Sequence, residues 1–115
     1  MVVGSSRGVG REIAIKLGKC GSNVVLIDIQ QPEIESVSKA ITTDGGTAAY
    51  FQCDVSKRDQ VDATISRIER EIGDISMLYH CCSLPSPRSV VTNPPSVRQT
   101  IDISVTSYFY VSFDL

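Results

Sequence analysis

The sequence lacks the features that mark several classes of protein. No apolar run approaches the roughly 20 residues of a membrane span, and we expect no secretory leader. No basic cluster accompanies the net charge of −2, so nucleic acid is not an expected partner. With 115 residues, of which 42% are hydrophobic, the chain is expected to form one soluble globular unit with a modest core.

The four cysteines lack the C-x-x-C spacing of redox and zinc motifs. Cys20 and Cys53 lie in apolar segments and are predicted to be small buried hydrophobes. His80, Cys81 and Cys82 are adjacent, but strand alternation sends Cys81 to the face opposite the other two. No metal is therefore expected, and a reducing, cytoplasmic location is the simplest prediction. Association of a longer form with a membrane or lipid droplet stays open.

A glycine-rich turn near the start of the chain is the main candidate site. The residues of this predicted cofactor-binding loop are Gly4, Ser6, Arg7, Gly8, Val9 and Gly10. A strand before the loop and a helix after it would surround an anion with unpaired N–H groups and a positive helix dipole. Gly4 allows the turn, Gly8 lets a diphosphate approach the backbone, and Gly10 lets the helix lie close to the sheet. The alternative is a turn whose glycines serve packing alone.

An acidic residue ends the next apolar segment. Residues 23–28 form an apolar run that ends at Asp28, about 20 residues after the loop, as in a dinucleotide-binding fingerprint. A carboxylate there can accept hydrogen bonds from both hydroxyls of an adenosine ribose, and it would repel a ribose phosphate. The alternative is that Asp28 is a polar residue that merely closes a strand.

The rest of the chain alternates segments of strand and helix character. Strands are predicted over residues 2–3, 23–28, 48–53 and 75–79. Helices between them are predicted to end near Gly21, Gly45 and Gly73. A capping box at Ser56–Asp59 is predicted to begin the third helix, whose apolar stripe extends to Ile72. The proline-rich residues 84–95 are predicted to form a loop. Residues 96–115 fit both a strand, over 100–105, and a helix.

This order predicts an α/β fold with a parallel sheet, helices on both faces and right-handed crossovers. Ligands of such sheets bind beyond the carboxyl ends of the strands. The glycine loop, Asp28, Asp54 and residues 80–83 all follow predicted strands, so they are expected to share one site. Asp54 and Val55 are predicted to lie where an adenine ring rests. The alternative for Asp54 is a loop carboxylate near the next helix N-terminus.

The chain resembles the amino-terminal half of a short-chain dehydrogenase/reductase over nearly its whole length. The family's Gly-x-x-x-Gly-x-Gly loop matches the three glycines, its acidic residue matches Asp28, and its Asp-Val pair matches Asp54–Val55. Residues 53–58 and 73–78 look most like the hydroxysteroid and epidermal retinol dehydrogenases. The resemblance implies an incomplete Rossmann-type domain over residues 1–115, with roughly four strands and the helix after them. It also implies an oxidoreductase for a lipid-like alcohol or ketone, with a homo-oligomer as one expected state.

Some family motifs are replaced or missing. His80–Ser83 stands where the family has Asn-Asn-Ala-Gly, a segment that approaches the cofactor, so weaker binding at Cys81 is implied. Ser104 stands where the family's helix carries a catalytic Asn. The catalytic Ser and Tyr-x-x-x-Lys pair are absent, since no tyrosine is followed by lysine four residues later. In the family those residues belong to the half that would follow Leu115.

Two signals compete over the cofactor. Asp28, followed by Ile29, supplies no cation for a ribose phosphate and favours NAD. Arg7 lies where the family's NADP users often carry a basic residue, so NADP is the less favoured cofactor. A degenerate homologue with weak or no nucleotide binding is the main alternative function. A site for S-adenosylmethionine is a third, but the loop is spaced for a diphosphate, which that ligand lacks.

Overall fold

The computed structural model describes all residues except 84–93 and 114. Four parallel strands form one sheet in the order β3-β2-β1-β4. The strands are β1 (Val2–Val3), β2 (Asn23–Asp28), β3 (Thr47–Gln52) and β4 (Tyr79–His80). β2 pairs with β3 along its full length, whereas β1 pairs over two residues with β2 on one side and β4 on the other. The predicted parallel α/β sheet is therefore confirmed.

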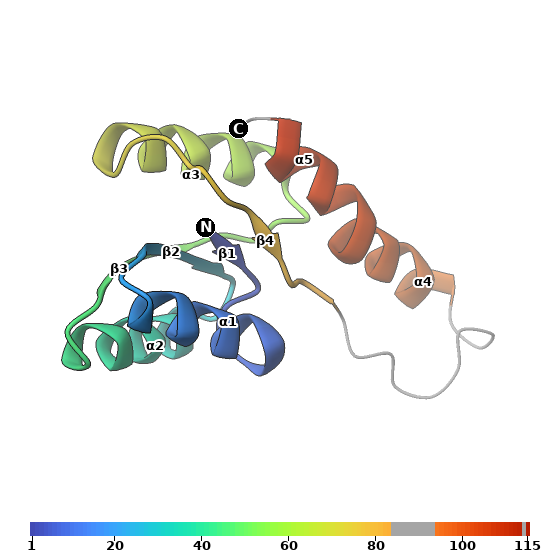
Figure 1. The fold of residues 1–115 in the computed structure, drawn as a ribbon. Coiled ribbons are helices and arrows are strands. Elements are labelled where there is room, and N and C mark those ends of the chain that lie inside the picture. Colours follow the sequence, from blue (N-terminus) through green and yellow to red (C-terminus); the bar gives the residue numbers. More distant parts are fainter. Residues whose placement is uncertain (84–93, 114) are drawn as a thin grey trace.

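Helices cover both faces of this sheet (Figure 1). Helices α1 (Gly8–Lys19) and α2 (Gln31–Thr43) cover one face, and α3 (Arg58–Glu71) and α5 (Ser107–Phe113) cover the other. Because side chains alternate along a strand, Val2 packs toward α1 and α2 while Val3 packs toward α3. The sheet thus separates two apolar cores.

The last segment of the chain is helical. Helix α4 (Pro94–Ile101) continues through a π-helical turn, η1 (Asp102–Thr106), into α5. The strand interpretation of residues 100–105 is therefore wrong, and the helical spacing describes this segment. Val111, 1% exposed, belongs to the core under α3, and burial of this side chain favours the helix. Pro94 and Pro95 begin α4, and the rest of the predicted proline loop lies outside the described residues.

Several local predictions differ from the structure. Cys20 is exposed because it caps the end of α1, beyond the helical stripe that meets the core. The capping box is absent: Lys57 is the N-cap of α3, and Ser56 bonds to Asp54 instead. Ile72 follows the last residue of α3 and is 37% exposed. The strand predicted over residues 75–79 is wrong except at Tyr79: β4 begins there and has two residues, because short β1 offers it only two partners. Strand β3 begins and ends one residue earlier than predicted.

Candidate functional site

A cavity of about 620 Å³ opens at the carboxyl ends of the strands. Its volume falls within the roughly 300–1,000 Å³ of small-molecule sites. The predicted site residues that line it are Gly4, Ser6, Arg7, Gly8, Val9, Asp28, Ile29, Asp54, Val55 and Cys81. Gly10 and Ser104 do not line it. The structure therefore brings together residues that end or follow the four strands and are far apart in the sequence.

The glycine loop has three differently constrained glycines. Gly4 and Gly8 have φ of +80° and +57°, the left-handed region that glycine adopts without strain. A Cβ on Gly8 would meet nothing within 4 Å, so the backbone there is open to a ligand. A Cβ on Gly10 would lie 2.0 Å from the Gly4 carbonyl oxygen, so Gly10 is a packing residue. The N-cap Arg7 makes no side-chain capping bond, which leaves the first N–H groups of α1 without a side-chain acceptor.

The Asp28 carboxylate joins the loop to the end of β2. Its Oδ2 accepts a hydrogen bond from the Ser6 N–H at 3.1 Å, and its Oδ1 accepts one from the Gln30 N–H at 3.1 Å. The Gly4 N–H donates to the Ile27 carbonyl at 2.8 Å, which ties the loop to the same strand end. No ion pair to Asp28 is present among the residues that the structure describes. The carboxylate is therefore held at the cavity wall, and no cation of the described residues pairs with it.

Asp54 has a structural role as well as a place on the cavity. Its Oδ1 accepts hydrogen bonds from the Ser56 N–H at 3.0 Å and the Ser56 hydroxyl at 2.7 Å. Its own N–H donates to Gln60 Oε1 at 3.0 Å. These bonds fix the turn before α3, in which Val55 is buried. The loop-carboxylate interpretation and the cavity-lining one therefore both describe Asp54.

Comparison with known proteins identifies the family to which this glycine loop and sheet belong. The sequence model of the family described as short chain dehydrogenase matches residues 1–114. The chain belongs to the short-chain dehydrogenase family. It is 25% identical to estradiol 17-beta-dehydrogenase 11 of Mus musculus over 97% of this chain and 38% of that protein. It is 32% identical to the short-chain reductase protein NovJ of Streptomyces niveus over 98% of this chain and 44% of that protein.

A solved structure shows the same likeness. A metagenomic short-chain oxidoreductase in complex with NADP superposes with a TM-score of 0.90 at 26% identity, covering 99% of this chain and 52% of that one. The chain thus spans about two fifths to one half of the length of these relatives. The family binds NAD or NADP, and the cavity lies where parallel α/β sheets bind such ligands.

The segment after β4, residues 81–83, lies against the glycine loop and both cores. Cys81 packs against the core under α1 and α2, and Cys82 packs against the core under α3, as strand alternation predicts. A Cβ on Gly4 would lie 2.8 to 2.9 Å from the backbone of these two residues, so the segment presses on the loop. Burial, then the negative charge of Asp28, raises the pKa of the Cys82 thiol to about 12. Burial also raises the pKa of Cys81, so both side chains are protonated thiols at neutral pH.

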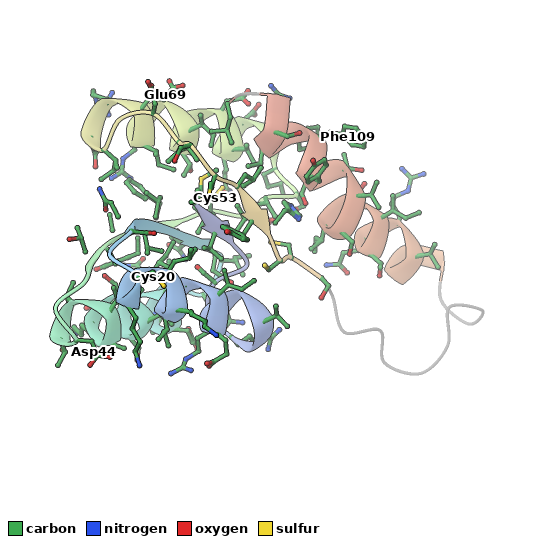
Figure 2. The ribbon with its side chains drawn as sticks, viewed as in Figure 1. Cys20, Asp44, Cys53, Glu69 and Phe109 are labelled. Carbon is green, nitrogen blue, oxygen red and sulfur yellow. The ribbon has the colours of Figure 1, made fainter. Side chains whose placement is uncertain are left out.

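Burial also shifts the pKa of two further cavity residues, Cys53 and His80. Burial is the main cause that raises the pKa of Cys53, which lies between the sheet and α3 (Figure 2). Burial lowers the pKa of His80, which is therefore neutral at pH 7 and hydrogen-bonds the Ser107 hydroxyl at 2.9 Å. No group of three or more His, Cys, Asp or Glu side chains in the described part of the chain is placed to hold a metal.

Three residues of the cavity wall were not predicted from the sequence. The missed residues are Gln30, Cys53 and Ile103. Each is next to a predicted residue. Gln30 and Cys53 lie just beyond the ends of strands, so the predicted strand ends could have indicated them. Ile103 adjoins Ser104, and the π-helical turn directs it to the cavity in place of its neighbour. Such a turn has no simple sequence pattern.

Proposed function

We propose that residues 1–115 are a partial Rossmann domain, the NAD-binding half of a short-chain oxidoreductase. The observation that supports this proposal best is that the glycine loop and the Asp28 carboxylate line one open cavity. In it, the open backbone at Gly8 and the start of α1 would hold the diphosphate, and Asp28 would accept bonds from the adenosine ribose. Asp54 and Val55 would lie beside the adenine. Bound NAD would supply the hydride acceptor for oxidation of an alcohol.

The preference for NAD over NADP rests on charge. A 2′-phosphate beside Asp28 would place two negative charges within a few ångströms, which costs about 1–4 kcal/mol at surface dielectric values. Among the described residues that line the cavity, Arg7 is the cation that could pair with such a phosphate, but its side chain is exposed. An exposed charge pair contributes only about 0–1 kcal/mol, so repulsion by Asp28 outweighs it.

Calorimetric titration of the chain with NAD and NADP tests this proposal. We expect NAD to bind more tightly than NADP, and Asp28→Asn to reverse or remove the preference by lowering NAD affinity about tenfold. Glu69→Gln is the matched control, because it removes one negative charge from the outer face of α3 (Figure 2) and should change neither affinity. Failure of both cofactors to bind would overturn the proposal.

The substrate that we propose is a small lipid-like alcohol or ketone of the retinoid or steroid type. It is supported by the likeness to the estradiol dehydrogenase and by the hydroxysteroid-like segments at residues 53–58 and 73–78. The competing function is a non-catalytic homologue with weak or no nucleotide binding, which the bulkier His80–Ser83 segment favours. Calorimetric titration of the chain with NAD separates the two, since firm binding favours the first function and weak or absent binding favours the second.

A homo-oligomer is a further part of the proposal. The C-terminal helix carries exposed apolar side chains at helical spacing, each about half exposed: Ile101, Val105, Tyr108 and Phe109. A contiguous apolar stripe of this kind is typical of an association surface. Sedimentation velocity of the chain and of Val105→Glu should show a loss of self-association in the variant. None of the described helices is long and apolar enough to cross a bilayer, and a cytoplasmic location is proposed from the free thiols.

A further inference from the structure

His80 lies between the glycine loop and the C-terminal helix, at the end of β4. It is the last residue of β4 and stands opposite Val3, the residue before the glycine loop. The next N–H, that of Cys81, donates to the Val3 carbonyl at 2.7 Å, so the backbone around His80 is fixed. The side chain lines the cavity and is half-buried. Movement of this imidazole would therefore change the shape of the cavity wall.

The imidazole is held by the C-terminal helix. Its Nε2 lies 2.9 Å from the Ser107 hydroxyl oxygen, and its ring meets the Tyr108 ring edge-on with centroids 5.7 Å apart. Ser107 is fully buried, and its hydroxyl donates to the Ile103 carbonyl. Because a hydroxyl has one proton, its oxygen must accept from His80, which places a proton on Nε2. The contact is thus directional: His80 donates and Ser107 accepts.

The carbonyl that Ser107 reaches lies in an irregular turn. Residues 102–106 are π-helical, a widened geometry whose backbone bonding is weaker than that of an α-helix and which often occurs at functional sites. A serine hydroxyl that bonds the carbonyl four residues earlier also bends a helix. Ile103, within this turn, lines the same cavity as His80. A chain of two hydrogen bonds therefore leads from the end of β4 to the cavity wall on the helix.

We propose that His80 is a positioning residue, which holds the π-helical turn against the cavity through Ser107 so that Ile103 forms one wall of the cofactor site. The proposal rests on the proposed function, since the site it shapes is the one assigned to NAD. It gives the His80 imidazole a role that depends on its Nε2 donor, not on its charge. A glutamine side chain can present an N–H donor at a similar reach, whereas alanine cannot.

The test compares five forms of the chain: wild type, His80→Ala, His80→Gln, Ser107→Ala and the double variant with both alanines. Calorimetry with NAD measures affinity, and amide hydrogen exchange measures the opening of residues 102–107. We expect His80→Ala to weaken NAD binding about tenfold and to speed exchange in the turn, because a buried polar partner loses its bond. His80→Gln should restore both values to near wild type. Ser107→Ala should match His80→Ala, and the double variant should add little, since both act through one link.

Each outcome decides one point. Unchanged exchange and affinity in His80→Ala would overturn the proposal, and so would a folded His80→Gln that behaves like His80→Ala. If His80→Ala fails to fold, His80→Gln and Ser107→Ala still give the comparison. If wild type binds no NAD, the proposed function fails, while the exchange measurements still test whether His80 holds the turn. An imidazole NMR signal for a proton on Nε2 in wild type is the expected spectroscopic signature, and the opposite tautomer would also overturn the proposal.

Discussion

Two regions of the molecule meet at the cavity, and they are built differently. The glycine-loop region, β1 to β3 with α1 and α2, has a six-residue strand pairing and a loop fixed by backbone bonds and Asp28. The β4 region, residues 79–83 and 94–113, has a two-residue strand and a helix interrupted by a π-helical turn. The first region is held mainly by backbone hydrogen bonds, and the second by side-chain contacts such as that of His80 with Ser107. The difference indicates that the glycine-loop wall of the cavity is the more rigid of the two.

The largest expected effect comes from filling the closest contact of the glycine-loop region. Gly10→Ala would place a Cβ 2.0 Å from the Gly4 carbonyl oxygen, a backbone atom that cannot move aside cheaply. We expect a loss of about 4 kcal/mol or more in the free energy of unfolding, measured by urea denaturation. Gly8→Ala is the matched control: its Cβ meets nothing, so only the left-handed φ should cost about 1 kcal/mol. Equal losses in the two variants would contradict the assigned contact.

The next effect concerns α3, which packs against both regions. Ile68, on the inner face of this helix, is fully buried, so Ile68→Ala should lower the free energy of unfolding by about 3 kcal/mol. Ile72, one turn later and 37% exposed, was predicted to share the same stripe. Ile72→Ala should cost less than about 1 kcal/mol by the same measurement. A large loss of unfolding free energy in Ile72→Ala would show that Ile72 is buried with the rest of the predicted stripe, and would contradict its exposure in the structure.

A smaller difference is expected in the local stability of the two regions. Amide protons of β2, a strand paired on both sides, should exchange only through global unfolding. Those of β4 and of residues 102–106 should exchange through local openings of lower free energy, because their pairing is short or irregular. Native-state hydrogen exchange measures both free energies. Equal protection would show that the regions form one cooperative unit.

The smallest effect concerns the thiols. Cys20 is exposed, whereas burial and the Asp28 charge raise the pKa of Cys82 to about 12, above its ordinary 9.0. Iodoacetamide at pH 8 should therefore modify Cys20 first and Cys82 last, as followed by mass spectrometry. Since the folded state holds the Cys82 proton more tightly than the unfolded state, this thiol lowers stability only as pH rises from about 9 toward 12. Rapid modification of Cys82 in Cys20→Ser would contradict the assigned burial.

The sequence predicted the parts whose signals are local. The loop glycines, Asp28 and the helices that end at glycine all follow from spacing and backbone chemistry, and the structure confirms their positions. The cavity then follows from the rule that parallel strands share one carboxyl edge. These features need only the pattern along the chain, because each is set by residues close in sequence.

The parts that the sequence did not predict depend on contacts between distant residues. The length of β4 is set by its partner β1, and the exposure of Cys20 by where α1 leaves the core. Residues 96–115 alternate like a strand and repeat like a helix, and packing of Val111 against α3 favours the helix. The link from His80 to Ser107 joins positions 27 residues apart, and no spacing rule predicts it.

The tight fit between Gly10 and the Gly4 carbonyl has a consequence for how such chains diverge. A descendant that no longer used a nucleotide would still need both glycines, because the helix and strand cannot come together without them. Of the three loop glycines, Gly8 alone has open space beside it, so its replacement would cost the fold only the strain of its left-handed φ. The presence of Gly8 is therefore more informative about ligand binding than the presence of Gly4 and Gly10, which the packing of the fold itself requires.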